Sequence, residues 1–427
     1  MTKEVLNKID LVEKEWLDLV ELEVNDFVKD SFLEKSMIIK TSNKTGEGID
    51  QLKDEIIKLS QVDYIKDDRG VFRMFLDRVF TMKGFGTVVT GTVSSGKAKI
   101  GDELEILPYA KSVKIRGLES HDEKVNEIRL GDRAAINLQI KDKLPIKRGN
   151  HLSTKNYFVS TNLIAVKVKK LIKCKNNLKN NQRIRFHVGT QEAIGRVLLT
   201  GNKLDLYHAA LIKLEKNIIC SFSDRFVIRS FSPILTIGGG TIIDATVSGK
   251  WKQISLYVNN LFKADSIEKR IITIIESDIY NIYSLDSLSK KISFSISLLE
   301  TYLKKIDDII YFKMNNITWI VTLNKYNLIR SMIKKILEEN HNNNPDKKGF
   351  IKEEINSKIN YDLNILDLIL NKLSQEKVIK FGNDHYSLFD FSIVLSDEEK
   401  NTSNQIVDIL NKEGLSTSSI DELSLMI

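Results

Sequence analysis

The pattern of apolar and polar positions divides the chain into three kinds of sequence. Near the amino terminus, apolar residues recur at helical spacing from Trp16 to Val28 and from Ile49 to Ile57, each time after a short apolar stretch. From about residue 70 to residue 246, short β-branched and aromatic runs alternate with glycines, which is typical of small closed barrels. Beyond residue 248 glycine nearly vanishes, and helical patterns rich in lysine, isoleucine, asparagine and leucine take over.

The stretch Asp77–Val93, which reads DRVFTMKGFGTVVTGTV, gives the clearest strand signal of the middle region. Its β-branched and aromatic residues are strand formers. Gly84, Gly86 and Gly91 stand where a hairpin must turn and where a neighbouring backbone must come close. The pattern therefore predicts two barrel strands joined by a turn.

A second barrel is predicted to start at Asn162–Lys170. The triple glycine Gly238–Gly240 precedes its last strand, Thr241–Ile243. It is not a phosphate loop, because no helix with Lys-Ser/Thr follows. We predict a tight turn between strands there.

The carboxy-terminal region contains an internal repeat. Two-stranded hairpins are predicted around Asn315-Asn316 and around Gly382–Asp384, and helical patterns precede each of them. The two hairpins stand about 70 residues apart. Helices followed by a β-hairpin make a winged helix, here in tandem, and a third copy begins at Asn401–Leu410.

Two short loops near the amino terminus carry residues that suit a guanine base. Asn7-Lys8-Ile9-Asp10 reads N-K-x-D, like the guanine-reading motif of GTPases. The Asp10 carboxylate can accept from guanine N1–H and the 2-amino group, Asn7 can meet the other purine edge, and the Lys8 stem can cover the ring. Ser42-Asn43-Lys44 resembles the second guanine loop, whose backbone amides would hold O6. The order of strands, loops and helices matches the back half of a GTPase domain.

The phosphate-binding half of such a domain has no counterpart in the sequence. No G-x-x-x-x-G-K-[S/T] occurs, so the amide cradle, the phosphate-binding lysine and the hydroxyl for Mg²⁺ are missing. Asp67-Asp68-Arg69-Gly70 reads D-x-x-G, like a γ-phosphate switch, but it follows the last helix without a strand before it, and we reject it. We expect a fragment truncated at both ends, with no catalytic residue and no GTP hydrolysis by this chain alone.

Composition narrows the class of protein. No apolar run is long enough to span a membrane and no signal peptide opens the chain, so we expect a cytoplasmic protein. Two cysteines, Cys174 and Cys220, argue against a disulfide framework, and six histidines without ligand spacing predict no metal site. A net charge of +7 permits nucleic-acid contact, but a solvated lysine-rich surface explains it equally well.

Taken in order, these features resemble the selenocysteine-specific elongation factors, a family of translational GTPases. DRVFTMKGFGTVVTGTV and GDRAAINL resemble the family's second domain, and FHVGTQEAIGRVLL and DRFVIRSFSPILTIGGGTIID resemble its third. General elongation factors lack the winged-helix tail. The resemblance implies a multi-domain fold: the back half of an α/β GTPase domain (1–67), two EF-Tu-like β-barrels (68–155 and 156–247), two winged helices (248–323 and 324–392) and an incomplete third (393–427).

The resemblance also implies an aminoacyl pocket at Asp77, Arg78 and Arg133. A selenol is ionised at neutral pH, whereas the hydroxyl of the precursor seryl-tRNA is neutral. Two guanidinium groups favour the anion, and Asp77 would fix the fork of one arginine. Without the resemblance, the residue types favour an ordinary surface ion pair.

The family implies a partner set and a function. The intact factor binds GTP with Mg²⁺ and delivers selenocysteyl-tRNA to the ribosome at recoded UGA codons, while its last winged helices grip a hairpin of the messenger RNA. We expect the winged helices of this chain to be spacers rather than RNA readers. One alternative is a non-hydrolysing aminoacyl-tRNA or RNA-binding module derived from a translation factor. A winged-helix DNA-binding regulator is another, but it leaves the N-K-x-D and S-x-K loops unexplained.

Overall fold

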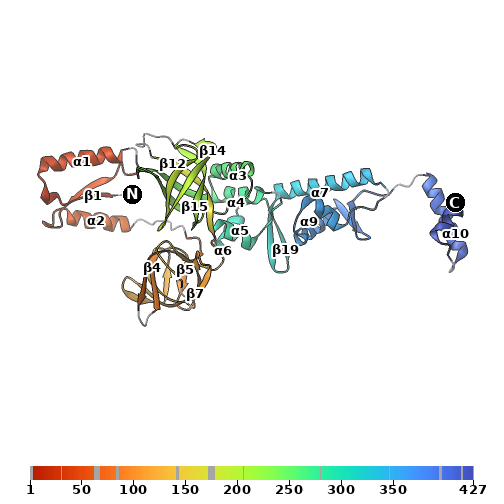
Figure 1. Cartoon of the computed structure of the whole chain (residues 1–427), viewed down its shortest axis with the longest axis horizontal. Helices are drawn as coiled ribbons and strands as arrows, with labels where there is room; N and C mark the ends of the chain where they lie inside the picture. The colour runs from red at the N-terminus through yellow and green to blue at the C-terminus, as the bar shows by residue number, and fades with distance from the viewer. Residues whose placement is uncertain are drawn as a thin grey trace.

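The computed structural model describes residues 3–29, 31–61, 68–82, 86–140, 144–171, 178–204, 206–278, 280–345, 347–393, 397–414 and 417–426. Asp67, Gly84 and Cys174, which the sequence singled out, lie outside these residues. The molecule is elongated: a small α/β unit and two barrels occupy one end, and helical units extend from them (Figure 1). In the described part of the chain, no helix is long and apolar enough to cross a membrane.

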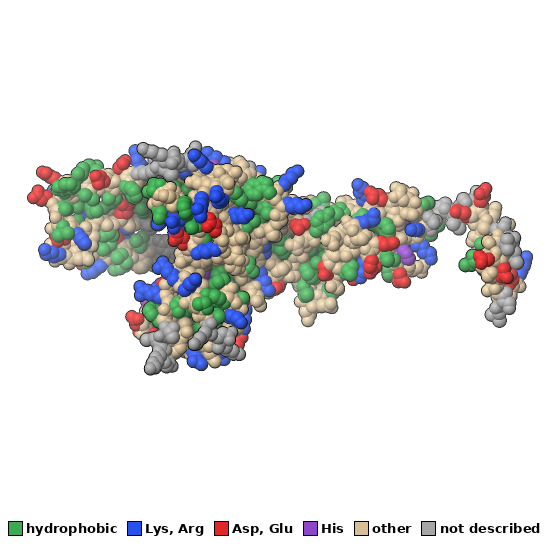
Figure 2. All heavy atoms as spheres, in the orientation of Figure 1, with side chains coloured by type: hydrophobic (Ala, Val, Ile, Leu, Met, Phe, Trp, Pro, Cys, Tyr) green, Lys and Arg blue, Asp and Glu red, His purple; other side chains and the backbone are tan. Residues whose placement is uncertain are grey.

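The amino-terminal unit is a two-stranded parallel sheet with helices, and the predicted order of strand, helix, strand and helix is confirmed. Trp16, Leu22, Phe27 and Phe32 are between 61% and 82% exposed, and Figure 2 shows apolar side chains gathered over this end of the molecule. The unit therefore leaves an apolar surface uncovered. Its elements are β1 (Lys3–Asn7), η1 (Ile9–Leu11), α1 (Lys14–Val28), β2 (Met37–Thr41) and α2 (Ile49–Ser60).

The first barrel contains the hairpin predicted at Asp77–Val93, since β3 and β4 pair antiparallel. Its strands close in the order β10-β4-β3-β11-β6-β7, with β7 pairing back to β10 and β8 added beside β7. A Cβ at Gly91 would lie 2.1 Å from the Phe75 carbonyl oxygen, which explains this glycine. The strands are β3 (Arg73–Met82), β4 (Gly86–Ser95), β5 (Lys97–Lys99), β6 (Glu103–Leu107), β7 (Lys111–Ser120), β8 (Glu123–Val125), β9 (Glu127–Arg129), β10 (Arg133–Gln139) and β11 (His151–Ser153).

The second barrel closes in the order β12-β15-β14-β13-β16-β17. Its core includes Phe186 stacked on Phe226, with ring centroids 4.9 Å apart. The strand predicted at 162–170 is confirmed as β12, which begins two residues earlier. The elements are β12 (Ser160–Lys170), β13 (Gln182–Val188), β14 (Gln191–Leu204), β15 (Tyr207–Ile219), β16 (Arg225–Ser230) and β17 (Thr236–Asp244).

The turn predicted at Gly238–Gly240 is wrong, because all three glycines lie inside β17 and pair with β12 and β16. A Cβ at Gly240 would lie 1.9 Å from the Lys167 carbonyl oxygen, and one at Gly239 would lie 2.7 Å from that of Phe226. The glycines therefore let three strands approach closely rather than let the chain reverse direction.

A buried ion pair joins the two barrels. The Arg73 guanidinium donates to both carboxylate oxygens of Asp224, at 2.7 and 2.8 Å. Their side chains are only 3% and 10% exposed, and the guanidinium also lies over the rings of Phe75 and Phe158. The two groups share two hydrogen bonds and are both shielded from water. Removing one of them would therefore leave a buried, unpaired charge on the other.

The rejected D-x-x-G motif lies where three parts of the chain meet. Asp68 Oδ1 accepts from the amides of Gly70 and Gly96, at 2.9 and 2.8 Å. The buried Arg69 donates to Ser221 Oγ of the second barrel (2.9 Å), and its carbonyl oxygen accepts from the amide of Ser295 in the helical region (2.7 Å). These groups hold structural contacts, which agrees with rejecting the motif as a phosphate switch.

The first helical unit is fixed to the second barrel. Lys291 pairs with the buried Asp244 at 2.7 Å, and Tyr257 donates to the same carboxylate at 2.7 Å. The hairpin predicted around Asn315-Asn316 is confirmed. The elements are α3 (Trp251–Lys263), α4 (Ile267–Glu276), β18 (Tyr283–Ser284), α5 (Leu285–Ile292), α6 (Ile296–Leu303), β19 (Ile309–Met314) and β20 (Ile317–Thr322).

The second helical unit also ends in a β-hairpin that follows helices, and it shares a core with the first. The hairpin predicted around Gly382–Asp384 is confirmed, and Phe312 and Val321 pack in one cluster with Ile355 and Leu366. The two units therefore form a continuous extension of the barrels. The elements are α7 (Leu323–Asn343), α8 (Lys352–Ile359), α9 (Leu363–Gln375), β21 (Ile379–Gly382) and β22 (His385–Leu388), and the helices α10 (Asp397–Glu413) and α11 (Ile420–Met426) follow.

Candidate guanine and aminoacyl sites

The parallel pairing of β1 and β2 brings the two predicted guanine loops together. Asn7 stands opposite Thr41 at the carboxyl ends of both strands. Ser42 Oγ donates to Asp10 Oδ1 at 2.6 Å, and Asn7 Oδ1 accepts from the Lys8 amide at 2.8 Å and from Thr41 Oγ1 at 3.3 Å. The Asn7 and Asp10 side chains are thus oriented by the neighbouring loop before any base binds.

The second loop is wound around the hydroxyl of the fully buried Ser42. The amides of Lys44 and Thr45 both lie 3.2 Å from Ser42 Oγ, and the Gly46 amide donates to the Ser42 carbonyl at 2.9 Å. Among the described residues, the Asn43 amide has no hydrogen-bond acceptor. That amide is therefore the one the structure leaves available for a base oxygen at this edge.

Glu55 on α2 ties the helix to β1 beneath these loops. Its carboxylate binds Lys3 at 2.8 Å and Lys58 at 2.7 Å. Hydrogen bonds from Lys3 and Lys58 lower the pKa of Glu55 to about 2. The charged carboxylate thus stabilises the strand that ends in the N-K-x-D loop.

Asp77 and Arg133 meet on the outer face of the first barrel. They lie on β3 and β10, with β4 between them. Arg133 forms an ion pair with Asp77 Oδ2, while Thr90 on β4 donates to Asp77 Oδ1 at 2.8 Å. Both oxygens of the carboxylate are therefore occupied.

A β-bulge places Arg78 beside this pair. Leu76 pairs with Gly91 and Arg78 pairs with Thr90, so Asp77 is the extra residue between them. The Arg78 side chain is exposed, and within the described residues it has no ion pair or hydrogen bond. The sequence pattern placed Asp77 and Arg78 side by side, but it could not show this bulge.

The charges around Asp77 keep it ionised. Partial burial alone would raise its pKa, but hydrogen bonds from Arg133 and Thr90, together with the charges of Arg133 and Arg78, hold the pKa of Asp77 below its ordinary value. The Asp77–Arg133 pair is then close to neutral, and Arg78 leaves a net positive charge at the surface. This arrangement suits a small anion.

Sequence reasoning missed two residues of this face. The sequence pattern presents Thr90 only as one of the β-branched strand formers, although alternation along β4 places it outward next to Asp77. Asn137 on β10 has a buried side-chain oxygen that has no hydrogen-bond partner among the described residues. Neither role has a sequence motif, because each depends on which strands are neighbours.

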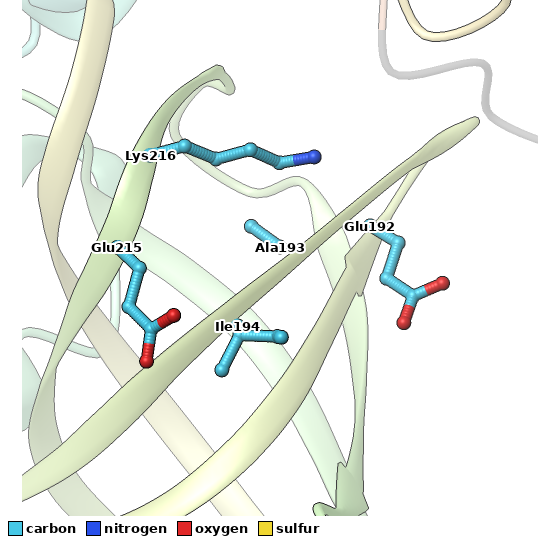
Figure 3. Close-up of a pocket in the computed structure, with 5 residues that line it drawn as sticks. All are labelled: Glu192, Ala193, Ile194, Glu215 and Lys216. Carbon is cyan, nitrogen blue, oxygen red and sulfur yellow. The ribbon is translucent and has the colours of Figure 1, made fainter.

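A separate hollow of about 390 Å³ lies on the second barrel (Figure 3). Its lining includes two carboxylates, but Glu192 binds Arg185 and Glu215 binds Arg183, each at 2.9 Å. The carboxylates are therefore already neutralised. In the described part of the chain, no group of three or more His, Cys, Asp or Glu side chains could hold a metal ion.

Two family models match the barrels in chain order. The model of elongation factor Tu domain 2 matches residues 86–153. The model of the β-barrel domain of the selenocysteine-specific elongation factor matches residues 165–248. Over its barrels, the chain is similar to the selenocysteine-specific elongation factors. The two closed barrels are thus EF-Tu-like, as the sequence resemblance implied.

Individual relatives agree with the family models. The chain is 37% identical over 243 residues to the selenocysteine-specific elongation factor of Desulfomicrobium baculatum, a match that covers 56% of this chain and 38% of that protein. The chain thus spans less than half the length of this curated relative.

Solved structures extend the likeness of the fold. The structure of a bacterial selenocysteine-specific elongation factor EF-Sec aligns with a TM-score of 0.71 at 22% identity, covering 99% of this chain and 67% of that one. Elongation factor SelB from Methanococcus maripaludis, solved with the GTP analogue GPPNHP, aligns with a TM-score of 0.52 at 29% identity, covering 58% and 60%. The first alignment includes the helical units, so the likeness of the fold is not confined to the barrels.

Proposed function

We propose that this chain carries the selenocysteyl-tRNA-binding part of a selenocysteine-specific elongation factor, which delivers that tRNA to the ribosome at recoded UGA codons. One observation supports this most: Asp77 holds Arg133, while no charged partner of Arg78 lies among the described residues of the same barrel face. A selenolate beside this face gains charge-assisted hydrogen bonds, whereas a serine hydroxyl leaves the extra positive charge unpaired.

The residues of this chain suit the guanine base of GTP but not its phosphates. Asp10, Ser42 and the Asn43 amide converge at the edge of the β1–β2 sheet, and this arrangement favours guanine. The sequence has no G-x-x-x-x-G-K-[S/T] loop for the phosphates and Mg²⁺. A near match, Gly91–Ala98, runs along β4 and β5 instead of leading into a helix. We therefore assign guanine contact to residues 1–67 and no hydrolysis to this chain alone.

The two helical units are proposed to be tandem winged helices that act as a spacer. Each ends in a β-hairpin that follows helices, at 248–323 and 324–392, and the helices α10 and α11 follow them. The core shared by Phe312, Val321, Ile355 and Leu366 would keep such a spacer straight. A messenger-RNA hairpin would then be held beyond these units, and the complete factor would work in the cytoplasm.

The pocket is tested by protection of the aminoacyl ester. The full chain is mixed with selenocysteyl-tRNA or with seryl-tRNA of the same tRNA, and the half-life of each ester is measured. We expect longer protection of the selenocysteyl ester, and Arg78→Ala should lower this preference by about tenfold, since a charge-assisted hydrogen bond is lost.

Arg129→Ala is the matched control, because Arg129 is an exposed arginine on β9 of the same barrel. If the Arg78→Ala and Arg129→Ala variants show the same preference for the selenocysteyl ester over the seryl ester, the assignment of the pocket is wrong.

A second candidate is a non-hydrolysing aminoacyl-tRNA-binding module derived from a translation factor. The absence of a phosphate loop from the sequence favours it over an autonomous GTPase. Protection that is unchanged by GTP would support the module, and protection that requires GTP and Mg²⁺ would support the first candidate.

A further inference from the structure

The second barrel contacts the backbone from which Asp77 projects. The carbonyl oxygen of Leu76, the residue before the bulge, accepts from Thr190 Oγ1 at 2.9 Å. It also accepts from the Gly149 amide at 3.1 Å, and the Leu76 amide donates to the Asn150 carbonyl at 3.0 Å. The peptide that leads into Asp77 is therefore held by both barrels.

Thr190 itself is held in a tight and well-packed turn between β13 and β14. Gly189 has φ 54°, and a Cβ there would lie 2.2 Å from the Phe75 ring, so the turn rests directly on β3. On the other side, Gln191 Nε2 lies 2.8 Å from His151 Nε2, and its side-chain oxygen accepts from the Ile219 amide at 3.2 Å. The Thr190 hydroxyl thus has little freedom to leave Leu76.

The contact matters because a bulge is a place where backbone register can shift. Asp77 is the extra residue of the bulge, and its two carboxylate oxygens set the positions of Arg133 and Thr90. Displacing Asp77 would change the distance between the Arg133 and Arg78 charges. Binding sites lose selectivity when their charged groups move by about 1 Å.

We propose that Thr190 is a positioning residue for the aminoacyl pocket. Through the Leu76 carbonyl, the second barrel fixes Asp77, and through Asp77 it fixes Arg133 relative to Arg78. This inference rests on the proposed function of the pocket. It makes the junction between the barrels part of the discrimination between selenocysteyl and seryl esters, although Thr190 contacts neither.

The test compares Thr190→Val, which keeps the shape and removes the hydroxyl, with Thr190→Ser, which keeps the hydroxyl. The readout is the ratio of ester half-lives for selenocysteyl-tRNA and seryl-tRNA on the full chain. A general loss of tRNA affinity changes both half-lives equally and leaves the ratio unchanged. We expect Thr190→Val to lower the ratio by about threefold to tenfold, as loss of one hydrogen bond permits, and Thr190→Ser to stay within about twofold of the original chain.

Ser221→Ala is the matched control, because it removes another hydrogen bond at the junction of the barrels, from Arg69, without touching Leu76. Melting temperatures confirm that each variant is folded. An unchanged ratio in Thr190→Val, an equal loss in Thr190→Ser, or an equal loss in Ser221→Ala would each overturn the positioning role. Arg78→Ala separates the two proposals: if it lowers the ratio and Thr190→Val does not, only the positioning role fails. If neither lowers it, the pocket itself fails.

Discussion

Arg133 reaches the Asp77 carboxylate across β4, so that one arginine of the candidate pocket is paired while its neighbour Arg78 has no partner among the described residues. Thr90, on the strand between them, occupies the other carboxylate oxygen. The pair is partly exposed to solvent, with 51% of the Arg133 side chain and 22% of the Asp77 side chain accessible. Such a pair contributes little to stability, and its arrangement is better explained by orientation of charge.

The selectivity of the pocket should depend on pH through the ligand rather than through the protein. Arginine stays charged over the accessible range, and the lowered pKa of Asp77 keeps this carboxylate ionised as the solution is acidified. The selenol loses its charge as the pH falls through its own pKa. We expect the selenocysteyl-to-seryl ratio of ester half-lives to fall towards one as this happens.

The measurement is that ratio between pH 7 and pH 4, corrected for the hydrolysis of each free ester. Arg78→Ala serves as the control, because its ratio should already be low and should change little with pH. A ratio that stays constant down to pH 4 would contradict recognition of the anion.

Thr90→Val should weaken the pocket without changing its net charge. The substitution removes the donor to Asp77 Oδ1, and we expect a loss of about 1 kcal/mol in the free energy of unfolding. The pKa of Asp77 should rise, because one hydrogen bond to the charged form is gone. Urea unfolding and an NMR titration of the carboxylate measure the two effects.

Thr92→Val is the matched control, since Thr92 lies exposed on the same face of β4, two residues along. Equal effects of the two substitutions would show that the hydrogen bond to Asp77 has no special role.

Glu55 should make the amino-terminal unit sensitive to acid. Its pKa is about 2 in the folded chain, below its ordinary value of 4.5, so its pairing with Lys3 and Lys58 stabilises the fold above about pH 4.5. That contribution is lost as the pH falls from about 4.5 towards 2. We expect Glu55→Gln to destabilise the unit at pH 7 and to have little effect near pH 2.

Fluorescence of Trp16, on α1 of the same unit, can report its unfolding in urea at each pH. Glu23→Gln on the exposed face of α1 is the control, and it should have a small effect on the stability of the unit at both pH values. A difference between the original chain and Glu55→Gln that is as large at pH 2 as at pH 7 would argue against the ion pairs.

The sequence was a good guide wherever strand order has a local pattern. The N-K-x-D and S-x-K loops were recognisable from the order of strands and helices around them, and the parallel Asn7–Thr41 register brings the two loops to one edge. Strand alternation located the hairpin that carries Asp77 and Arg78. The repeat in the helical region located both of its hairpins.

The other contacts of the candidate site depend on which strands and barrels pack against each other. No single stretch of sequence predicts that packing. The contact of Thr190 with Leu76 joins residues 114 positions apart, and that of Arg69 with Ser221 joins residues 152 positions apart. Thr90 became part of a site only because a bulge turned Asp77 towards it. The triple glycine of the second barrel could not be assigned from sequence, because the lack of a Cβ suits both a tight turn and a close approach of strands.

Gly240→Ala distinguishes these two uses of glycine. A methyl group at Gly240 would lie 1.9 Å from the Lys167 carbonyl oxygen, so β12 and β17 must separate to admit it. We expect a loss of about 1–3 kcal/mol in the free energy of unfolding of the barrel, in the range found for overpacked cores. Gly382→Ala on β21 is the control, because a methyl group there meets nothing within 4 Å. Chemical denaturation of the full chain, followed by near-UV circular dichroism, compares the two. Equal stability of Gly240→Ala and the original chain would mean that β12 and β17 are not packed this closely.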